Sequence, residues 1–353
     1  MRRMVCALLL AAAPGWALAQ GVLRLFNWNN YITEQSVKAF EAECKCRLAQ
    51  DYFSDNEEML AKLAAGATGY DVIVPSGNAV QALVASGQLR PLDHARIPNL
   101  KNIKPEFLDQ WFDPGNRYSV PYAYSLTILG YNAERMRSLD IPTDTWAAIF
   151  EPKHLERIKG KVTVLDSQRE LFAAALIYLG HSANDDDEDH LKAARDLILR
   201  AKPYWAAFNA GSYFKELAIG NIWLAHGYSV DFFTAQQDAR AAGRRFTIGF
   251  TTPREGAVFG LDNLVIHKTG RELRLAYEFI NFWLAGSASA EITNAIGAGN
   301  PNRVAMQWVK PEIAANRNIF PDAEEFKRLQ SLRDYDRKTR RLLNRLWVEV
   351  KVR

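Results

Sequence analysis

Segments with the pattern of strands and segments with the pattern of helices alternate along almost the whole chain of 353 residues. The first part alternates three strands with three helices, and a second set begins after Asn132. Such alternation is typical of α/β proteins, in which helices pack on the faces of a sheet. The sequence therefore predicts an α/β fold.

The expected elements follow from apolar periodicity and from Gly, Pro and capping signals. Thr33 is a plausible N-cap for the first helix, and Gly66, Gly87 and Gly180 each close a helix. We expect strands at residues 22–27, 47–53, 71–76, 118–121, 127–132, 161–166, 222–226, 246–250 and 258–267, and helices at residues 34–43, 57–65, 78–86, 170–179, 189–200, 230–242 and 271–285.

The amino terminus has the pattern of an export signal. Arg2 and Arg3 precede a short apolar run, and Ala17 and Ala19 form an A-x-A cleavage site. The run is shorter than the ~20 residues that a membrane span needs. We expect a signal peptide at residues 1–19, cleavage after Ala19, and a mature protein in the periplasm.

Length and charge limit the organisation of the mature chain. About 330 residues exceed one usual hydrophobic core, so two domains are expected. The net charge of +4 is small, and its basic excess gathers after residue 327. A nucleic-acid patch there is the alternative to an amphipathic helix. We favour the helix, and expect no nucleic-acid partner, because Leu342, Leu343, Leu346 and Trp347 recur at helical spacing.

Motifs for catalysis or metal binding do not stand out. The sequence has no G-x-S-x-G, P-loop or H-E-x-x-H, and its six histidines show no ligand spacing. The acidic run at residues 185–189 reads as a solvated loop rather than a calcium site. Cys44 and Cys46 form either a strained disulfide or one face of a strand. We predict no enzyme activity, catalytic residue, metal or cofactor.

Aromatic and acidic side chains cluster at the predicted ends of strands, where open α/β sheets bind ligands. Trp28 and Tyr31 follow the first strand, Glu170 begins a helix, and Asp262 interrupts an apolar strand. Taken singly, these are ordinarily a core ring, a helix-dipole acid and a salt-bridge partner. Together they suit an organic cation, whose charge needs acids and whose methylenes need aromatic faces.

Several motifs carry a family resemblance. They are Phe-Asn-Trp-Asn-Asn-Tyr at 26–31, Ser-Asp-Asn-Glu at 54–57, Gly-Tyr-Asp-Val-Ile-Val-Pro-Ser at 69–76, Tyr-Ser-Val-Pro-Tyr at 118–122, Ala-Phe-Asn at 207–209, Glu-Gly at 255–256 and Ile-Phe-Pro-Asp at 319–322. With these motifs the chain resembles the periplasmic polyamine-binding proteins, of the spermidine/putrescine type, that serve ABC importers.

The resemblance implies a two-lobed periplasmic binding protein fold of type II. Lobe 1 would comprise residues 20–126 and 258–303, and lobe 2 residues 127–257 and 304–353, with the ligand cleft between them. Hinge closure would bury the ligand. The expected function is to capture a polyamine such as putrescine or spermidine and deliver it, as a monomer, to an inner-membrane ABC permease.

The ligand-binding residues are expected to come from both lobes. Glu170 and Asp262 would neutralise ammonium groups, and Trp28 and Tyr31 would pack the carbon chain. The expected set, by match to the family or by position, is Trp28, Asn29, Tyr31, Ser76, Glu170, His226, Ser229 and Asp262.

Departures from the family pattern leave other ligands open. Asn29 and Asn30 replace a hydroxyl and an acid, His226 replaces a wall tryptophan, and Ser229 replaces an acid of the putrescine-preferring branch, although Asp231 is near. One alternative is the same fold holding a smaller polar or zwitterionic amine, with His226 facing the cleft. Others are a sensory binding protein and, least favoured, a secreted hydrolase.

Overall fold

A single mixed sheet runs through the computed structural model, which describes residues 21–29 and 31–352. The strand order is β2-β1-β3-β9-β4-β7-β5-β6, with β10 beside β9 and β8 beside β4. The strands are β1 (Val22–Trp28), β2 (Arg47–Phe53), β3 (Val72–Ile73), β4 (Ser119–Asn132), β5 (Val162–Val164), β6 (Ala207–Phe208), β7 (Leu224–Tyr228), β8 (Ile248–Thr251), β9 (Ala257–Ile266) and β10 (Leu329–Gln330). The predicted α/β class is confirmed.

Helices cover both faces of this sheet. They are α1 (Glu34–Cys44), α2 (Asn56–Ala64), α3 (Gly77–Ala85), α4 (Ala133–Ser138), α5 (Ala147–Phe150), α6 (Pro152–Leu155), α7 (Gln168–Tyr178), α8 (Glu188–Ala201), α9 (Tyr213–Ile219), α10 (Ser229–Ala241), α11 (Leu273–Trp283), α12 (Gly286–Ile296), α13 (Pro311–Ala314), α14 (Ala323–Phe326) and α15 (Arg337–Val352). In the part of the chain that the structure describes, no helix has the length and apolar character of a membrane span.

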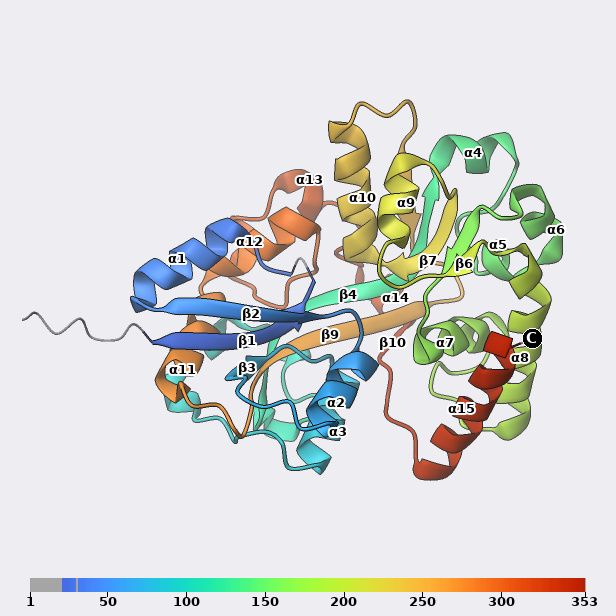
Figure 1. Cartoon of the computed structure of the whole chain (residues 1–353). Helices are drawn as coiled ribbons and strands as arrows, with labels where there is room; N and C mark the ends of the chain where they lie inside the picture. Colours follow the sequence, from blue (N-terminus) through green and yellow to red (C-terminus); the bar gives the residue numbers. More distant parts are fainter. Residues whose placement is uncertain (1–20, 30, 353) are drawn as a thin grey trace, which may run out of the picture.

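The first lobe is built around β1, β2 and β3, which pair in parallel. Helix α1 lies on one side of the β1–β2 pair, and α2 and α3 lie on the other (Figure 1). Thr33 caps α1 as expected, since its hydroxyl accepts a hydrogen bond from the Ser36 backbone N–H. The ring of Phe40 on α1 packs edge-on against Phe279 on α11, which closes this part of the core.

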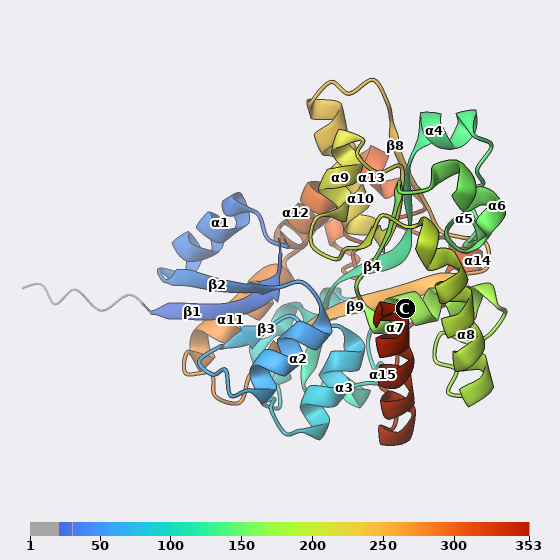
Figure 2. The same ribbon diagram turned by 45° about the vertical axis from the view of Figure 1, so that its right-hand side comes forward.

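The second lobe is built around β5, β6 and β7. Helices α9 and α10 lie on one side of these strands, and α7, α8 and α15 lie on the other (Figure 1, Figure 2). The predicted amphipathic helix near the carboxyl terminus is α15. It buries Leu342, Leu343 and Leu346 and pairs Glu349 with Arg195 of α8 at 2.6 Å.

Two long antiparallel strands, β4 and β9, connect the lobes (Figure 1). We predicted separate strands at residues 118–121 and 127–132, but both belong to β4. Residues Ala123–Leu126 continue the strand because they pair with Asp262–Phe259 of β9 across a register shift after Pro121. Beyond Thr127, β4 pairs with β7 of the second lobe.

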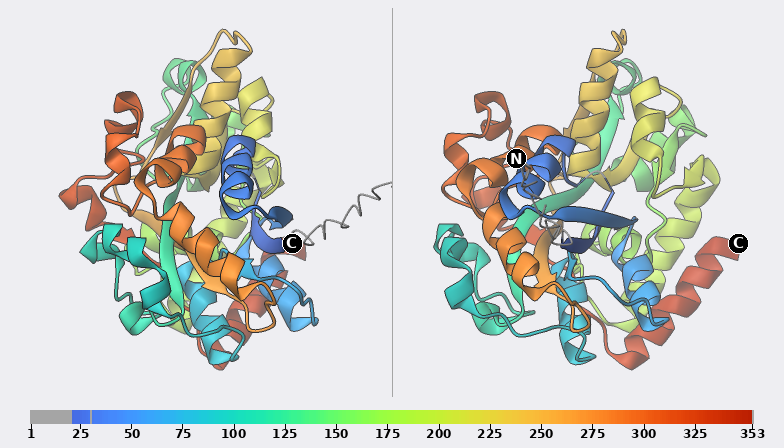
Figure 3. Two further views of the ribbon diagram at one scale, coloured as in Figure 1. Left: turned by 90° about the vertical axis from the view of Figure 1, so that its left-hand side faces the viewer. Right: turned by 60° about the vertical axis from the view of Figure 1, so that its left-hand side comes forward.

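A third connection crosses the molecule late in the chain. Helices α13 and α15 are close in sequence but lie on opposite sides of the molecule (Figure 3). The segment between them contains β10, which pairs with Ala257 and Val258 at the start of β9. The carboxyl-terminal helix is thereby brought to the second lobe.

Other differences from the sequence-based elements have local causes. Strand β3 is only Val72–Ile73, because Pro75 has no backbone N–H for the sheet, Ser76 forms only an isolated bridge to Asp262, and α3 begins at Gly77. Cys44 ends α1 and Cys46 precedes β2, and the two form a disulfide, so a strand carrying both cysteines is wrong. The predicted signal peptide lies outside the described residues.

Candidate ligand-binding site

A cavity of about 390 Å³ lies where side chains from both lobes meet. Its volume is within the range of small-molecule sites in proteins. The residues that line it are Trp28, Asn29, Tyr31, Phe53, Ser54, Asn56, Ser76, Ser125, Thr127, Glu170, Ala210, Gly211, Phe214, Lys215, Tyr228, Val230, Asp231, Gly260 and Asp262. Many of them follow β1, β2 and β3 or begin α7 and α10, so strand ends and helix starts converge on one space.

Asp262 on β9 forms the most buried acidic group of the cavity, with 4% of the residue exposed. One carboxylate oxygen accepts a hydrogen bond from the Ser76 hydroxyl and the other accepts one from the Tyr31 hydroxyl, both at 2.6 Å. Burial raises the pKa of Asp262 to about 7, although both hydrogen bonds favour the ionised form. The two hydroxyls therefore fix the orientation of a carboxylate that would be stabilised by a cation.

Glu170 is a second acid, in the first turn of α7. Burial raises the pKa of its carboxyl group to about 7, the Thr127 hydroxyl bonds to it and lowers that pKa, and Glu57 raises it further. Its Oε2 atom has no hydrogen-bond partner among the residues that the structure describes. A buried acceptor without a partner is costly, so this oxygen is placed to receive a donor from a ligand.

Asp231, in the first turn of α10, is the third acid. The Tyr213 hydroxyl donates to its Oδ2 at 2.5 Å and itself accepts a hydrogen bond from the Tyr228 backbone N–H at 2.8 Å. Burial raises the pKa of Asp231 to about 6, against the effect of the Tyr213 bond. This chain of bonds holds the carboxylate and the end of β7 together.

Aromatic rings supply the apolar surface. Trp28 packs on Phe53 with ring centroids 4.6 Å apart and lies 6.4 Å from the ring of Tyr31. Tyr228 and Phe214 line the cavity from the second lobe. Rings on both sides of acidic groups provide the contacts that an alkyl-ammonium chain needs.

The charge of the lining favours a cation. Asp262, Glu170 and Asp231 contribute three carboxylates, and Lys215 is the one basic side chain among the lining residues. With the acids ionised, the sum is two negative charges. Such a lining is electrostatically complementary to a dication.

A family model described as bacterial extracellular solute-binding protein matches residues 35–321. The chain belongs to this family of solute-binding proteins.

Similar proteins and structures include several named as binding or transporting polyamines. A putrescine/cadaverine-binding protein of Pseudomonas aeruginosa is 52% identical over the full length of both chains. The putrescine-binding periplasmic protein PotF of Escherichia coli is 33% identical, covering 99% of this chain and 96% of PotF. A putative spermidine/putrescine ABC transporter structure from Listeria monocytogenes superposes with a TM-score of 0.86 at 30% identity, covering 94% of this chain and 99% of that one. The expected resemblance and the two-lobed fold are confirmed.

Most of the residues singled out in the sequence come together in the cavity of this solute-binding protein. Those that line it are Trp28, Asn29, Tyr31, Ser76, Glu170 and Asp262. Their binding roles stay predictions. His226 and Ser229 do not line it.

The expectation that His226 faces the cleft is wrong. The residue is 1% exposed, its ring packs edge-on against Trp146 at 5.5 Å, and its Nδ1 accepts a hydrogen bond from the Leu165 backbone N–H at 3.4 Å. Burial lowers the pKa of His226 to about 3, so the ring is neutral. His226 lies two residues before the end of β7, and Tyr228, at the strand end, lines the cavity instead.

Ser229 also differs from expectation. It begins α10 and is 2% exposed, and its Oγ accepts a hydrogen bond from the Leu126 backbone N–H at 3.1 Å. The hydroxyl thus ties α10 to the connecting strand β4. The acid of this helix that lines the cavity is Asp231, two residues further on.

Sequence reasoning missed several lining residues. Phe214 lies on α9 beyond an irregular loop, and Thr127 lies inside a strand that we had divided into two. Neither had a local signal. Asp231 did have one, because an acid in the first turn after a strand end is suited to a ligand at the sheet edge.

Proposed function

We propose that this protein binds a short aliphatic diamine of the putrescine or cadaverine class in the periplasm and delivers it to an inner-membrane ABC permease. The observation that carries the proposal is the meeting of Asp262, Glu170 and Asp231 with aromatic rings in one cavity between lobes. The names of the Pseudomonas and Escherichia relatives support the same ligand class.

The acidic and aromatic side chains of the cavity would contact different parts of the ligand. One ammonium would donate to Asp262, which is already oriented by Tyr31 and Ser76. The other would donate to the free oxygen of Glu170 or to Asp231. Methylenes between them would pack on Trp28 and the second-lobe rings, where each buried methylene contributes about 0.8 kcal/mol and each cation–π contact about 0.5–2 kcal/mol.

The lobe division proposed is residues 20–126 with 258–303, and 127–257 with 304–353. In support, β4 changes its pairing from β9 to β7 near Thr127, and β10 joins β9 at Ala257 and Val258. Asn302 bonds to Leu284 and Lys310 still bonds to Asn294, both in the first lobe, whereas Asn318 bonds to Phe250 of the second. These contacts favour a last crossing between residues 310 and 318, later than the proposed residue 303. Hinge bending at these connections would enclose the ligand.

Export completes the proposal. Residues 1–19 have the pattern of a cleavable signal peptide, and cleavage after Ala19 would release the mature chain into the periplasm. The Escherichia relative is named as periplasmic. Amino-terminal sequencing of protein recovered from the periplasm, expected to begin at Gln20, tests this step.

Calorimetry on the untagged mature protein tests the ligand. We expect one putrescine or cadaverine to bind with micromolar or tighter affinity. Spermidine and spermine should bind more weakly, because the exposed ammonium of Lys215 lies among the lining residues and would repel a further amine. Absence of both heat and thermal stabilisation with all four amines would refute the ligand class but not the fold.

Lys215 also favours a second candidate, a zwitterionic amine. Its ammonium would pair with the ligand carboxylate while Asp262 pairs with the amine. 4-Aminobutyrate and putrescine, titrated in competition, separate the two. If Lys215→Gln weakens the binding of 4-aminobutyrate and strengthens the binding of putrescine, the Lys215 ammonium pairs with the ligand carboxylate. If 4-aminobutyrate never competes, the diamine proposal stands alone.

A further inference from the structure

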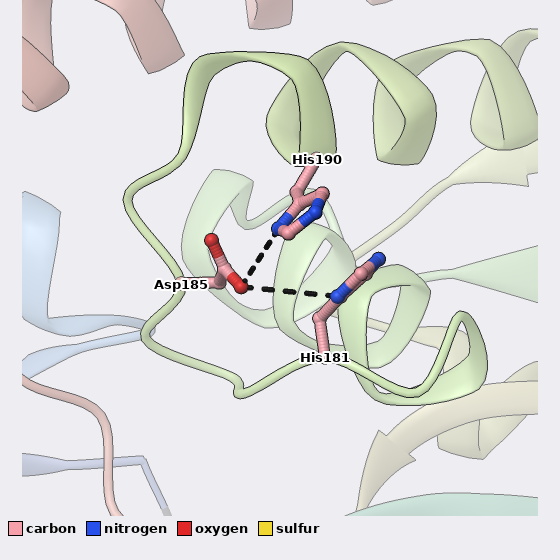
Figure 4. A group of neighbouring side chains, drawn as sticks. All are labelled: His181, Asp185 and His190. Carbon is pink, nitrogen blue, oxygen red and sulfur yellow. Dashed lines mark hydrogen bonds and ion pairs between the residues drawn. The ribbon is translucent and has the colours of Figure 1, made fainter.

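A group of possible metal ligands lies in the connection between α7 and α8, away from the residues that line the cavity. His181, Asp185 and His190 come from one short stretch, and their side chains converge (Figure 4). Both Nδ1 atoms approach the same carboxylate oxygen of Asp185, at 3.0 Å from His190 and 3.9 Å from His181. The expectation that the histidines show no ligand spacing therefore fails for this pair.

We propose that His181, Asp185 and His190 bind a divalent transition-metal ion, with Zn²⁺ as the best match. Bonds of about 2.0–2.2 Å from zinc to imidazole nitrogen and carboxylate oxygen place neighbouring tetrahedral ligand atoms about 3.3 Å apart. The two observed separations lie on either side of that value. All the ligand atoms are within 4.8 Å of one another, so small side-chain rotations suffice.

The carboxylate is oriented before any ion arrives. The Asp185 Oδ1 atom accepts a hydrogen bond from the Asp187 backbone N–H at 2.9 Å, which leaves Oδ2 toward the two rings. The Asp185 carbonyl accepts a hydrogen bond from the Tyr335 hydroxyl at 2.9 Å, and the His190 backbone N–H donates to Asp187 at 3.1 Å. A ligand set held by its supporting bonds loses less freedom on binding a metal.

The two imidazoles also face each other closely. Their ring centroids are 3.7 Å apart at an angle of 20°. The His181 nitrogen, at 3.9 Å, is too far from Asp185 for a hydrogen bond, so the carboxylate serves only His190 in that way. An ion between the three atoms would engage both nitrogens and the oxygen at once.

Charge and access both favour a cation here. The neighbouring residues 186–189 are all acidic and exposed, and Lys192 is the lysine that forms ion pairs with this run, with Glu188 and Asp189, in the described part of the chain. The side chain of His190 is 42% exposed, so solvent reaches the group and water can complete the coordination. Two imidazoles favour zinc and similar ions over Mg²⁺ and Ca²⁺, which prefer oxygen ligands.

Calorimetry with Zn²⁺ on the full-length mature protein, untagged and freed of metal, tests this site. We expect one ion per chain, a rise in melting temperature with Zn²⁺ and none with Mg²⁺, and a tetrahedral absorption spectrum with Co²⁺. His181→Ala and His190→Ala should each weaken Zn²⁺ binding at least tenfold. The matched control is His154→Ala, which removes a partly buried histidine outside the group and should leave binding unchanged.

Two results would overturn the proposal: no saturable Zn²⁺ binding to the wild type, or undiminished binding in both histidine variants. Putrescine titration and circular dichroism verify that each variant is folded. Should one histidine variant fail to fold, Zn²⁺ binding is measured on Asp185→Asn and on the other histidine variant. Each of these removes one proposed ligand atom, so undiminished binding in both would overturn the proposal.

Discussion

The two walls of the cavity differ in how complete they are. The first wall, from Trp28, Tyr31, Ser76 and Asp262, contains a carboxylate with both oxygens already hydrogen-bonded to neighbouring hydroxyls. On the second wall, from Glu170, Asp231 and Tyr228, the Glu170 Oε2 atom lacks a partner within the described part of the chain. The first wall is thus preorganised for ligand binding, whereas the second wall has an acceptor that a bound ligand would satisfy.

This difference predicts an order of events. A preformed wall binds a ligand without ordering new side chains, which lowers the entropic cost of the first contact. The second wall gains most from closure, because a ligand donor satisfies Glu170. We therefore expect the diamine to bind first to the Asp262 wall and then to attract the second lobe.

The largest expected effect comes from removing the charge of the first wall. Asp262→Asn should weaken putrescine binding about 100- to 1,000-fold, because a buried, hydrogen-bonded charge pair contributes about 2–5 kcal/mol to binding. Calorimetry measures the change. Asp238→Asn, an exposed acid of α10, is the control and should bind like the wild type. A loss of less than tenfold at Asp262 would contradict the assigned role of this wall.

Lowering the pH should weaken both walls together. The pKa values of about 7 for Asp262 and Glu170 and about 6 for Asp231 mean that these acids take up protons as the pH falls. A dication binds the ionised acids, so affinity should drop about 30-fold or more between pH 8 and pH 5.5, since one pKa unit corresponds to about 1.4 kcal/mol.

Proton release on binding tests the predicted direction of the pH dependence of affinity. Near pH 7 the ligand should displace protons from the acids, while its own amines, with pKa values of about 10, stay charged. Calorimetry in two buffers of different ionisation enthalpy counts those protons. Proton uptake on binding, or affinity that is flat from pH 8 to pH 5.5, would show that the acids are ionised before binding.

Glu170→Gln tests the second wall alone. We expect about a tenfold loss of putrescine affinity, smaller than for Asp262, because Asp231 also lines the cavity and can accept the same ammonium. The loss should appear mainly as faster dissociation in stopped-flow fluorescence of the tryptophans. An effect larger than that of Asp262→Asn would reverse the order proposed for the walls.

Tyr213→Phe should have the smallest effect. It removes the hydroxyl that joins Asp231 to the Tyr228 backbone but leaves every lining side chain in place. One hydrogen bond contributes about 1 kcal/mol, so putrescine affinity should fall about fivefold. The neighbouring exposed variant Lys215→Gln is a useful contrast, since it should raise rather than lower affinity for a diamine.

Much of the fold follows from local signals, but the site follows only in part. Strand β2 has the predicted bounds and Thr33 caps α1, because apolar periodicity and capping are local properties. Strand β4 was divided because its middle, from Ala123 to Leu126, is held by pairing with a strand far along the chain.

The same limit applies to the site. Trp28, Glu170 and Asp262 were found because aromatic and acidic residues at strand ends are unusual by themselves. His226 was misplaced because depth along β7, which decides whether a side chain is in the core or in the cavity, depends on the helices packed around it. Phe214 reaches the cavity only through the course of an irregular loop.

Asp262 lies on β9, one of the strands that link the lobes. Residues near a hinge move little when the lobes on either side of it rotate. The bound ligand would therefore stay almost still while the outer surfaces of the lobes move over much larger distances. A longer amine would stop closure at a smaller rotation angle. A small difference in ligand length would then produce a larger difference in the spacing of the outer lobe surfaces that a transporter would contact.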